Sequence, residues 1–184
     1  MKRSPGKNKT LEKLAAEFGA EYVSGRIKDS IRGSSPLAFS ISPLREEKSF
    51  FGWGNRVKSW SLIVVLKREQ PHFLISKQFS TKAERSGPED PFCPPPWAAV
   101  TPKEPIGAWQ VVAEGNIVFP RELEMKLSSM SSSFWGISHG FPKSHRNSLA
   151  EAVSASQLVF YFRPSINAAD VRIALQIADE FERL

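Results

Sequence analysis

The chain has 184 residues and a mass of 20.6 kDa, a length that suits one domain able to bury a hydrophobic core without disulfides or metal. Hydrophobic residues make up 41% of the sequence and charged residues 24%, which excludes an intrinsically disordered chain. Cys93 is the only cysteine, so an internal disulfide and a cysteine-based zinc site are both excluded. The longest apolar run, residues 62–66, is far shorter than the ~20 residues of a membrane span, and we expect a cytoplasmic protein without one.

The net charge of +6 is distributed unevenly along the chain. Residues 1–9 carry four bases and no acid, and we expect them to form a disordered basic tail ahead of a single domain over residues 10–184. A second basic stretch, residues 45–68, carries six bases and two acids, whereas bases and acids balance from residue 120 onwards. The high isoelectric point therefore reflects a tail and one stretch, not a uniformly basic body.

The first predicted element is a short amphipathic helix over residues 10–18. Its apolar residues recur at the spacing of one helix face: Leu11, Leu14, Ala15 and Phe18. We expect Thr10 to cap the N-terminus of this helix and Gly19 to end it. The alternation in the sequence LAFSI, residues 37–41, then predicts a strand.

The strongest strand signal is VKSWSLIVVLK, residues 57–67. Two sets of apolar residues alternate along it: Trp60, Leu62, Val64 and Leu66 on one face, and Ile63 and Val65 on the other. Both faces of this strand are therefore predicted to be covered. A turn at residues 50–55 precedes the strand, and the sequence HFLIS, residues 72–76, is predicted to be its hairpin partner. Seven prolines predict a long loop without regular structure at residues 80–106.

Five elements are predicted after this loop in the order strand, helix, strand, strand, helix: residues 108–114, 119–130, 134–138, 157–162 and 167–184. Pro120 suits the first turn of the middle helix, and Asn167 suits the N-cap of the last one. Strands joined by hairpins and followed by single helices predict a single α+β domain with a largely antiparallel sheet, a short N-terminal helix, a middle helix and a long C-terminal helix.

A catalytic or metal centre is not predicted. A thiol hydrolase needs its cysteine at a helix N-terminus or at a turn that favours the thiolate, and the sequence DPFCPPPW around Cys93 allows neither. His139 and His145 are six residues apart and are separated by Gly140 and Pro142, which is not the spacing of a metal site. We therefore expect no catalytic residue, no metal and no cofactor, and keep a Cys93/histidine hydrolase as the second alternative.

Binding is predicted where aromatic and basic residues alternate, because rings stack on bases and cations neutralise phosphates. The candidate binding residues lie in residues 50–60 and in the sequence GFPKSHRN: Trp53, Arg56, Lys58, Trp60, Lys143, His145 and Arg146. The same residues of the first segment also fit a hairpin whose rings fold back onto the core. The two segments form one basic surface only if they meet in the fold.

Three stretches together resemble a group of uncharacterised bacterial proteins, known as domains of unknown function: residues 66–76, 108–127 and 134–140. They share a strand, a second strand with proline, histidine and apolar residues, a Trp-x-Val strand, a helix and a strand with Trp and Gly. The resemblance covers the middle and end of the chain. It implies an α+β fold and no activity, substrate or site.

These observations favour a non-enzymatic protein-interaction module. Its contact surface is predicted in three loops, residues 50–60, 80–106 and 140–148, because loops carry recognition and the chemistry of a reaction centre is missing from the pattern. The first alternative is a weak binder of nucleic acid or of another anionic surface, without sequence specificity, through the aromatic and basic hairpin of residues 50–60.

Overall fold

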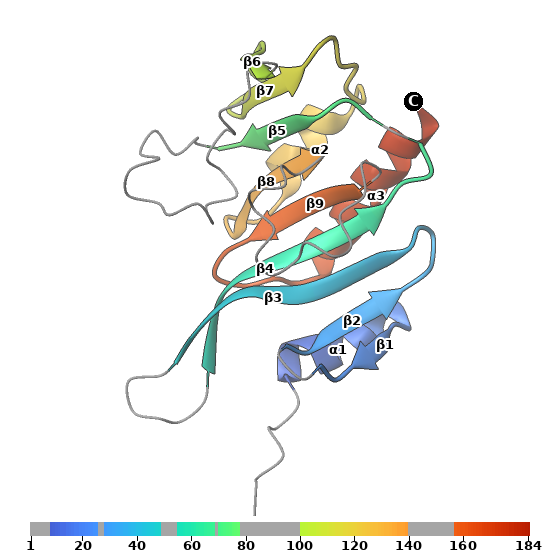
Figure 1. The fold of residues 1–184 in the computed structure, drawn as a ribbon, viewed down its shortest axis with the longest axis vertical. Coiled ribbons are helices and arrows are strands. Elements are labelled where there is room, and N and C mark those ends of the chain that lie inside the picture. The colour runs from blue at the N-terminus through green and yellow to red at the C-terminus, as the bar shows by residue number, and fades with distance from the viewer. Residues whose placement is uncertain (1–7, 26–27, 49–54, 69, 78–99, 140–156) are drawn as a thin grey trace, which may run out of the picture.

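The computed structural model describes residues 8–25, 28–48, 55–68, 70–77, 100–139 and 157–184 (Figure 1). Three helices are found in these residues: α1 (Lys9–Phe18), α2 (Leu123–Ser129) and α3 (Ala168–Arg183). Nine strands accompany them: β1 (Glu21–Val23), β2 (Ser30–Gly33), β3 (Phe39–Lys48), β4 (Asn55–Val65), β5 (Phe73–Ser76), β6 (Val100–Pro102), β7 (Gln110–Glu114), β8 (Phe134–His139) and β9 (Gln157–Phe162).

All nine strands join one antiparallel sheet in the order β1-β2-β3-β4-β9-β8-β5-β7-β6. The predicted α+β class with an antiparallel sheet and three helices is therefore confirmed. The apolar strand β9 is buried at all six positions and lies in the centre, between β4 and β8. A strand that is apolar on both faces gains most from a central place, because both of its faces are then removed from water.

The predicted hairpin of residues 57–67 with residues 72–76 is wrong. β4 pairs with β3 and β9, whereas β5 pairs with β7 and β8. Between β4 and β5 the chain passes the end of α3, where the backbone N–H of Lys67 donates to Glu182. β8 and β9, which come later in the sequence, occupy the space between the two strands.

The three helices cover one face of the sheet, and their buried side chains belong to one hydrophobic core (Figure 1). One face of α3 packs into this core through six buried apolar residues at helical spacing: Val171, Ala174, Leu175, Ile177, Ala178 and Phe181. Asn167 caps this helix, as predicted, and its side-chain oxygen accepts from the backbone N–H of Asp170 at 2.9 Å.

The ends of the shorter helices differ from the prediction. Asn8, not Thr10, caps α1, and its side chain accepts from the N–H groups of Thr10 and Leu11, so Lys9 belongs to the helix and not to the tail. Gly19 ends α1 in the left-handed conformation with φ 57°, as predicted. α2 begins only at Leu123, because Pro120 and the two residues after it form the turn that leads into the helix.

Two further predictions need correction. β6 lies within the stretch that was predicted to have no regular structure. Pro102 is tolerated there because β6 is the last strand of the described sheet and pairs on one side only. The strand β4 is buried as predicted on the core face, but on its other face Val65 is 39% exposed while Ile63 is buried.

Candidate functional site

The antiparallel register divides the charged residues between two ends of the sheet. At one end β3, β5 and β9 finish and β4, β7 and β8 begin, since Trp60 pairs with Phe162 while Ser76 pairs with both Gly136 and Gln110. We call this end the basic end and define it by residues 45–48, 55–60, 76–77, 110, 134–135 and 162–163, with Asp170 of α3. Figure 1 shows the β3–β4 pair projecting beyond the other strands at this end.

Six bases and three acids lie at the basic end, a net charge of +3. The bases are Arg45, Lys48, Arg56, Lys58, Lys77 and Arg163, and the acids are Glu46, Glu47 and Asp170. They come from two strands, from the residues that directly follow two other strands and from one helix, at positions more than one hundred residues apart in the chain. The fold thus concentrates half of the protein's net charge at one end of the sheet.

Lys77 lies directly after β5 and is held over an aromatic ring. Its ammonium Nζ is 5.1 Å from the centroid of the buried Trp109 ring, and its backbone N–H donates to the carbonyl of Trp135 at 3.4 Å. Partial desolvation lowers the pKa of Lys77, and the charge of Asp170 opposes this shift. A lysine in this environment is a point charge that a carboxylate of a partner would stabilise.

Arg163 follows β9 and has a similar environment. Its guanidinium carbon lies 5.6 Å from the centroid of the half-buried Trp135 ring, and its backbone N–H donates to the carbonyl of Ser133 at 2.6 Å. No carboxylate of the described residues lies within ion-pair distance of Lys77 or Arg163. Both cations are therefore positioned by rings and backbone, and their charges are not neutralised there.

Asp170 is the buried acid beneath this end. Its carboxylate accepts from the backbone N–H of Ser131 at 2.9 Å, from the hydroxyl of Ser131 and from the amide of Asn167 at 2.8 Å. These bonds link the start of α3 to the turn before β8. Asp170 is only 2% exposed, so its role is to fix this turn and not to meet a ligand.

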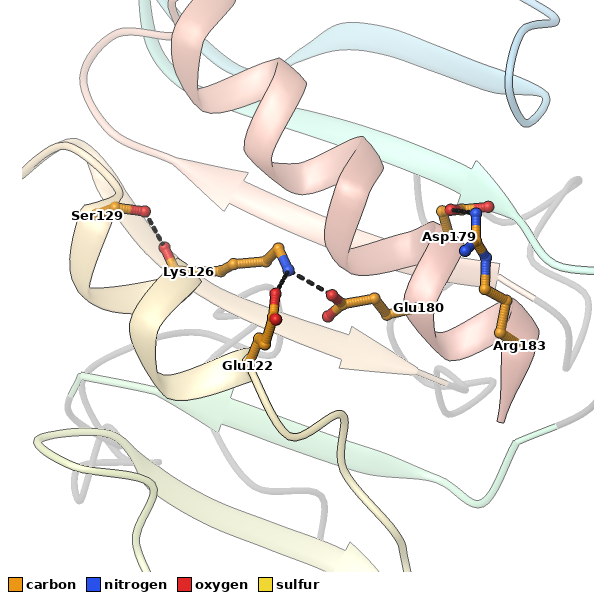
Figure 2. Close-up of polar contacts among 6 residues, drawn as sticks. All are labelled: Glu122, Lys126, Ser129, Asp179, Glu180 and Arg183. Carbon is orange, nitrogen blue, oxygen red and sulfur yellow. Dashed lines mark hydrogen bonds and ion pairs between the residues drawn. The ribbon is translucent and has the colours of Figure 1, made fainter.

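We call the opposite end of the sheet the ion-paired end. It contains four bases and five acids of the described residues: Lys67, Arg68, Lys126, Arg183, Glu114, Glu122, Asp179, Glu180 and Glu182. Figure 2 shows Lys126 of α2 between Glu122, at 2.8 Å, and Glu180 of α3, and Arg183 beside Asp179. Burial alone would lower the pKa of Lys126, but the hydrogen bonds with Glu122 and Glu180 raise it overall. The acids of this end are largely occupied by contacts within the molecule.

Two of the three histidines also meet at the ion-paired end. The His72 and His139 ring centroids are 6.4 Å apart, and His72 Nδ1 lies 3.0 Å from a Glu114 carboxylate oxygen. His139 ends β8, one residue beyond the predicted strand, and is fully buried. Its ring stacks on Phe73, and its Nδ1 lies 3.1 Å from the carbonyl oxygen of Pro71. This geometry makes His139 a core residue that fixes the start of β5. Cys93 and His145, which the hydrolase alternative needs, lie outside the described residues.

The predicted binding residues have different outcomes. Trp53, Lys143, His145 and Arg146 lie outside the described residues. For Arg56 and Lys58 the structure describes the backbone, which places both at the basic end. The prediction that Trp60 is an exposed stacking ring is wrong. Trp60 is 4% exposed and packs in the core, and its indole N–H donates to the carbonyl of Pro164 at 3.3 Å.

The described residues that flank the two predicted basic segments lie at opposite ends of the sheet. Lys48 and Asn55, which flank residues 49–54, lie at the basic end, whereas His139 and Gln157, which flank residues 140–156, lie at the ion-paired end. The sequence analysis missed Lys77, Trp135 and Arg163 as site residues. Each is a single charged or aromatic residue at a strand end, and no local spacing connects the three.

The described residues contain no group of three histidines, cysteines and carboxylates able to hold a metal ion. Among the same residues, no helix combines the length and the apolar character needed to cross a membrane.

The fold and the charged sheet end define an α+β protein with a single antiparallel sheet covered by helices on one face. The chain is similar in structure to the mycobacterial trehalose monomycolate transport factor A, TtfA, with a TM-score of 0.56 over 95% of this chain and 91% of that one. The two sequences are 9% identical, so the similarity extends to the fold alone. No family model and no curated protein matches the sequence, and the resemblance to domains of unknown function stays a prediction.

Proposed function

We propose that this protein is a non-enzymatic interaction module that binds an acidic surface of another protein through the basic end of its sheet. The observation that carries the proposal is the pair Lys77 and Arg163, two exposed cations held over indole rings with no described carboxylate beside them. Charges of this kind give an interface its specificity and its association rate. The fold is shared with TtfA, which is named a transport factor, and this supports a role without catalysis.

The proposal assigns the protein to a reducing compartment such as the cytoplasm, because its one cysteine offers no disulfide. Nucleic acid is the less favoured partner. Stacking needs ring faces that a base can reach, and Trp60 and Trp109 are each 4% exposed while Arg163 lies over Trp135.

The test is a matched pair of charge reversals in the full chain. Lys77→Glu with Arg163→Glu removes the two cations of the basic end, and Lys67→Glu with Arg68→Glu makes the same change of net charge at the ion-paired end. Binding of a fluorescent poly-L-glutamate peptide is measured by anisotropy, with circular dichroism to verify folding.

We expect the first variant to lose about tenfold or more in affinity and the second to stay within about threefold of the parent. Equal losses in both variants would show that net charge alone drives the binding and would overturn the proposal. Tighter binding of oligo-dT than of poly-glutamate by the parent protein would overturn it in favour of nucleic acid.

A further inference from the structure

Two lysines of the described residues have opposite environments. Lys126 lies between the carboxylates of Glu122 and Glu180, and these hydrogen bonds hold its amine in the charged form. Lys77 has its Nζ 5.1 Å from the centroid of the Trp109 ring, and no carboxylate of the described residues lies within ion-pair distance of it. An amine without such a partner loses its proton more readily, and the neutral amine is the nucleophile.

The acid nearest in effect to Lys77 is Asp170, and its carboxylate is already engaged. It accepts from the backbone N–H and the hydroxyl of Ser131 and from the amide of Asn167. The partial desolvation of Lys77 outweighs the charge of Asp170, so the pKa of Lys77 lies below its ordinary value. The Trp109 ring also attracts the cation, but it leaves the N–H groups of Lys77 to solvent.

The position of Lys77 makes its amine accessible from solution. The residue directly follows β5, its side chain is exposed, and its backbone is fixed because its N–H donates to the carbonyl of Trp135 at 3.4 Å. The ring of Trp109 lies beneath the amine on one side and is itself buried. A small electrophile can therefore approach the amine without any movement of the sheet.

We propose that Lys77 is a site of acylation by an acyl thioester and that this modification weakens binding at the basic end. This inference rests on the proposed function and adds its regulation. The neutral amine attacks the carbonyl carbon of the thioester, so that an N–C bond forms and the C–S bond breaks. The departing thiolate takes up the proton that the nitrogen loses and leaves as a thiol. The resulting amide has no charge, and the basic end loses one of its two described cations that lie over rings.

The first experiment measures which lysines are acylated. The full chain is incubated with S-acetyl-N-acetylcysteamine, both folded and in concentrated urea, and the acetylation rate of each lysine is followed by peptide mass spectrometry. This thioester is uncharged, so the positive charge of the basic end does not attract it. The controls are Lys13 of α1 and Lys67 after β4, which are also exposed.

We expect Lys77 in the folded protein to react about threefold or more faster than Lys13 and Lys67, because only its amine is both desolvated and accessible. In urea the three rates should be about equal. Equal rates in the folded protein would overturn the inference, and so would the same preference in urea, because the local sequence and not the fold would then cause it. Both outcomes leave the proposed function intact.

The second experiment measures the effect on binding. The parent protein and Lys77→Arg, which keeps the charge but has no amine to acylate, are treated with the thioester and titrated with fluorescent poly-L-glutamate. We expect the treated parent to lose about threefold or more in affinity and the treated variant to change by less than about twofold. Equal losses, or no loss in the acylated parent, would overturn the regulatory role. An untreated parent that fails to bind would overturn the proposed function, whereas the rates of the first experiment would still decide the acylation site.

Discussion

The two ends of the sheet differ in how their charges are used. At the ion-paired end Lys126 links Glu122 to Glu180, Arg183 lies beside Asp179, and Glu114 lies beside His72 (Figure 2). At the basic end the described cations lie over rings, and the one buried carboxylate is saturated by hydrogen bonds from the protein itself.

This difference separates structural charges from charges available for recognition. An ion pair at the surface contributes little to stability. It also attracts a charged partner only weakly, because its two opposite charges cancel each other's field beyond a short distance. An uncompensated group of bases produces a field that an acidic partner can sense at a distance. The comparison therefore directs attention to Lys77 and Arg163, which have no carboxylate of the described residues within ion-pair distance.

The largest expected effect concerns the core that both ends share. Phe134 at the basic end contacts Trp109, Phe160 and Phe162, and Phe181 at the ion-paired end stacks on Phe73; both are fully buried. Phe134→Ala and Phe181→Ala should each lower the free energy of unfolding by ~3–5 kcal/mol, because the lost ring leaves a cavity.

Urea denaturation followed by tryptophan fluorescence measures both losses. The surface variant Met125→Ala is the control, because that side chain is 63% exposed and its removal should change stability by less than ~0.5 kcal/mol. A small loss for only one phenylalanine would show that the two ends unfold separately and do not share one core.

An intermediate effect is expected from Tyr161, which lies on β9 between the two ends. Burial raises the pKa of Tyr161 above its ordinary value of 10.0, against the lowering effect of its hydrogen bond with Ser138. The neutral phenol is favoured in the folded state, so its contribution is complete below pH 10 and is lost as pH rises above 10. The unfolding free energy should fall by up to ~1.4 kcal/mol per pH unit for this one proton.

Tyr161→Phe should remove that slope, whereas Ser138→Ala should retain it, because it deletes the hydrogen bond but keeps the phenol. Chemical denaturation between pH 9 and pH 11, at constant ionic strength, gives the unfolding free energies of the parent protein and the two variants. An unchanged slope in Tyr161→Phe would mean that other groups cause the alkaline loss.

The smallest effect is expected from the ion pair of Arg183 with Asp179. The two side chains are 76% and 33% exposed, so Arg183→Ala should cost less than ~0.5 kcal/mol in thermal or urea unfolding. Affinity for poly-glutamate should not change either, since the pair lies at the other end of the sheet. A marked change in affinity would contradict the division of the sheet into two functional ends.

The helix and strand assignments were largely predictable because their signals are local. The stripe of α3, its cap at Asn167 and the left-handed Gly19 each follow from spacing within a few residues. The pairing of β5 was not predictable in this way. Its partners β7 and β8 come later in the chain. The pairing depends on which strands gain most from burial at the centre of the sheet, and this is a property of the whole fold.

The candidate site shows the same limit. Arg56 and Lys58 were found from their local alternation with aromatic residues, and the fold places both at the basic end. Trp60 was misjudged, because an aromatic residue next to bases has the same spacing whether its ring faces solvent or core. Lys77 and Arg163 have no local signal at all.

The sequence by itself determined the class of fold, the positions of its three helices and the absence of an internal disulfide, because these depend on composition and on local periodicity. The tertiary structure alone decided which strands are neighbours and which charges share an end of the sheet. Antiparallel pairing converts distant positions into neighbouring ones, and this long-range arrangement brings Lys77 and Arg163 to the same end of the sheet.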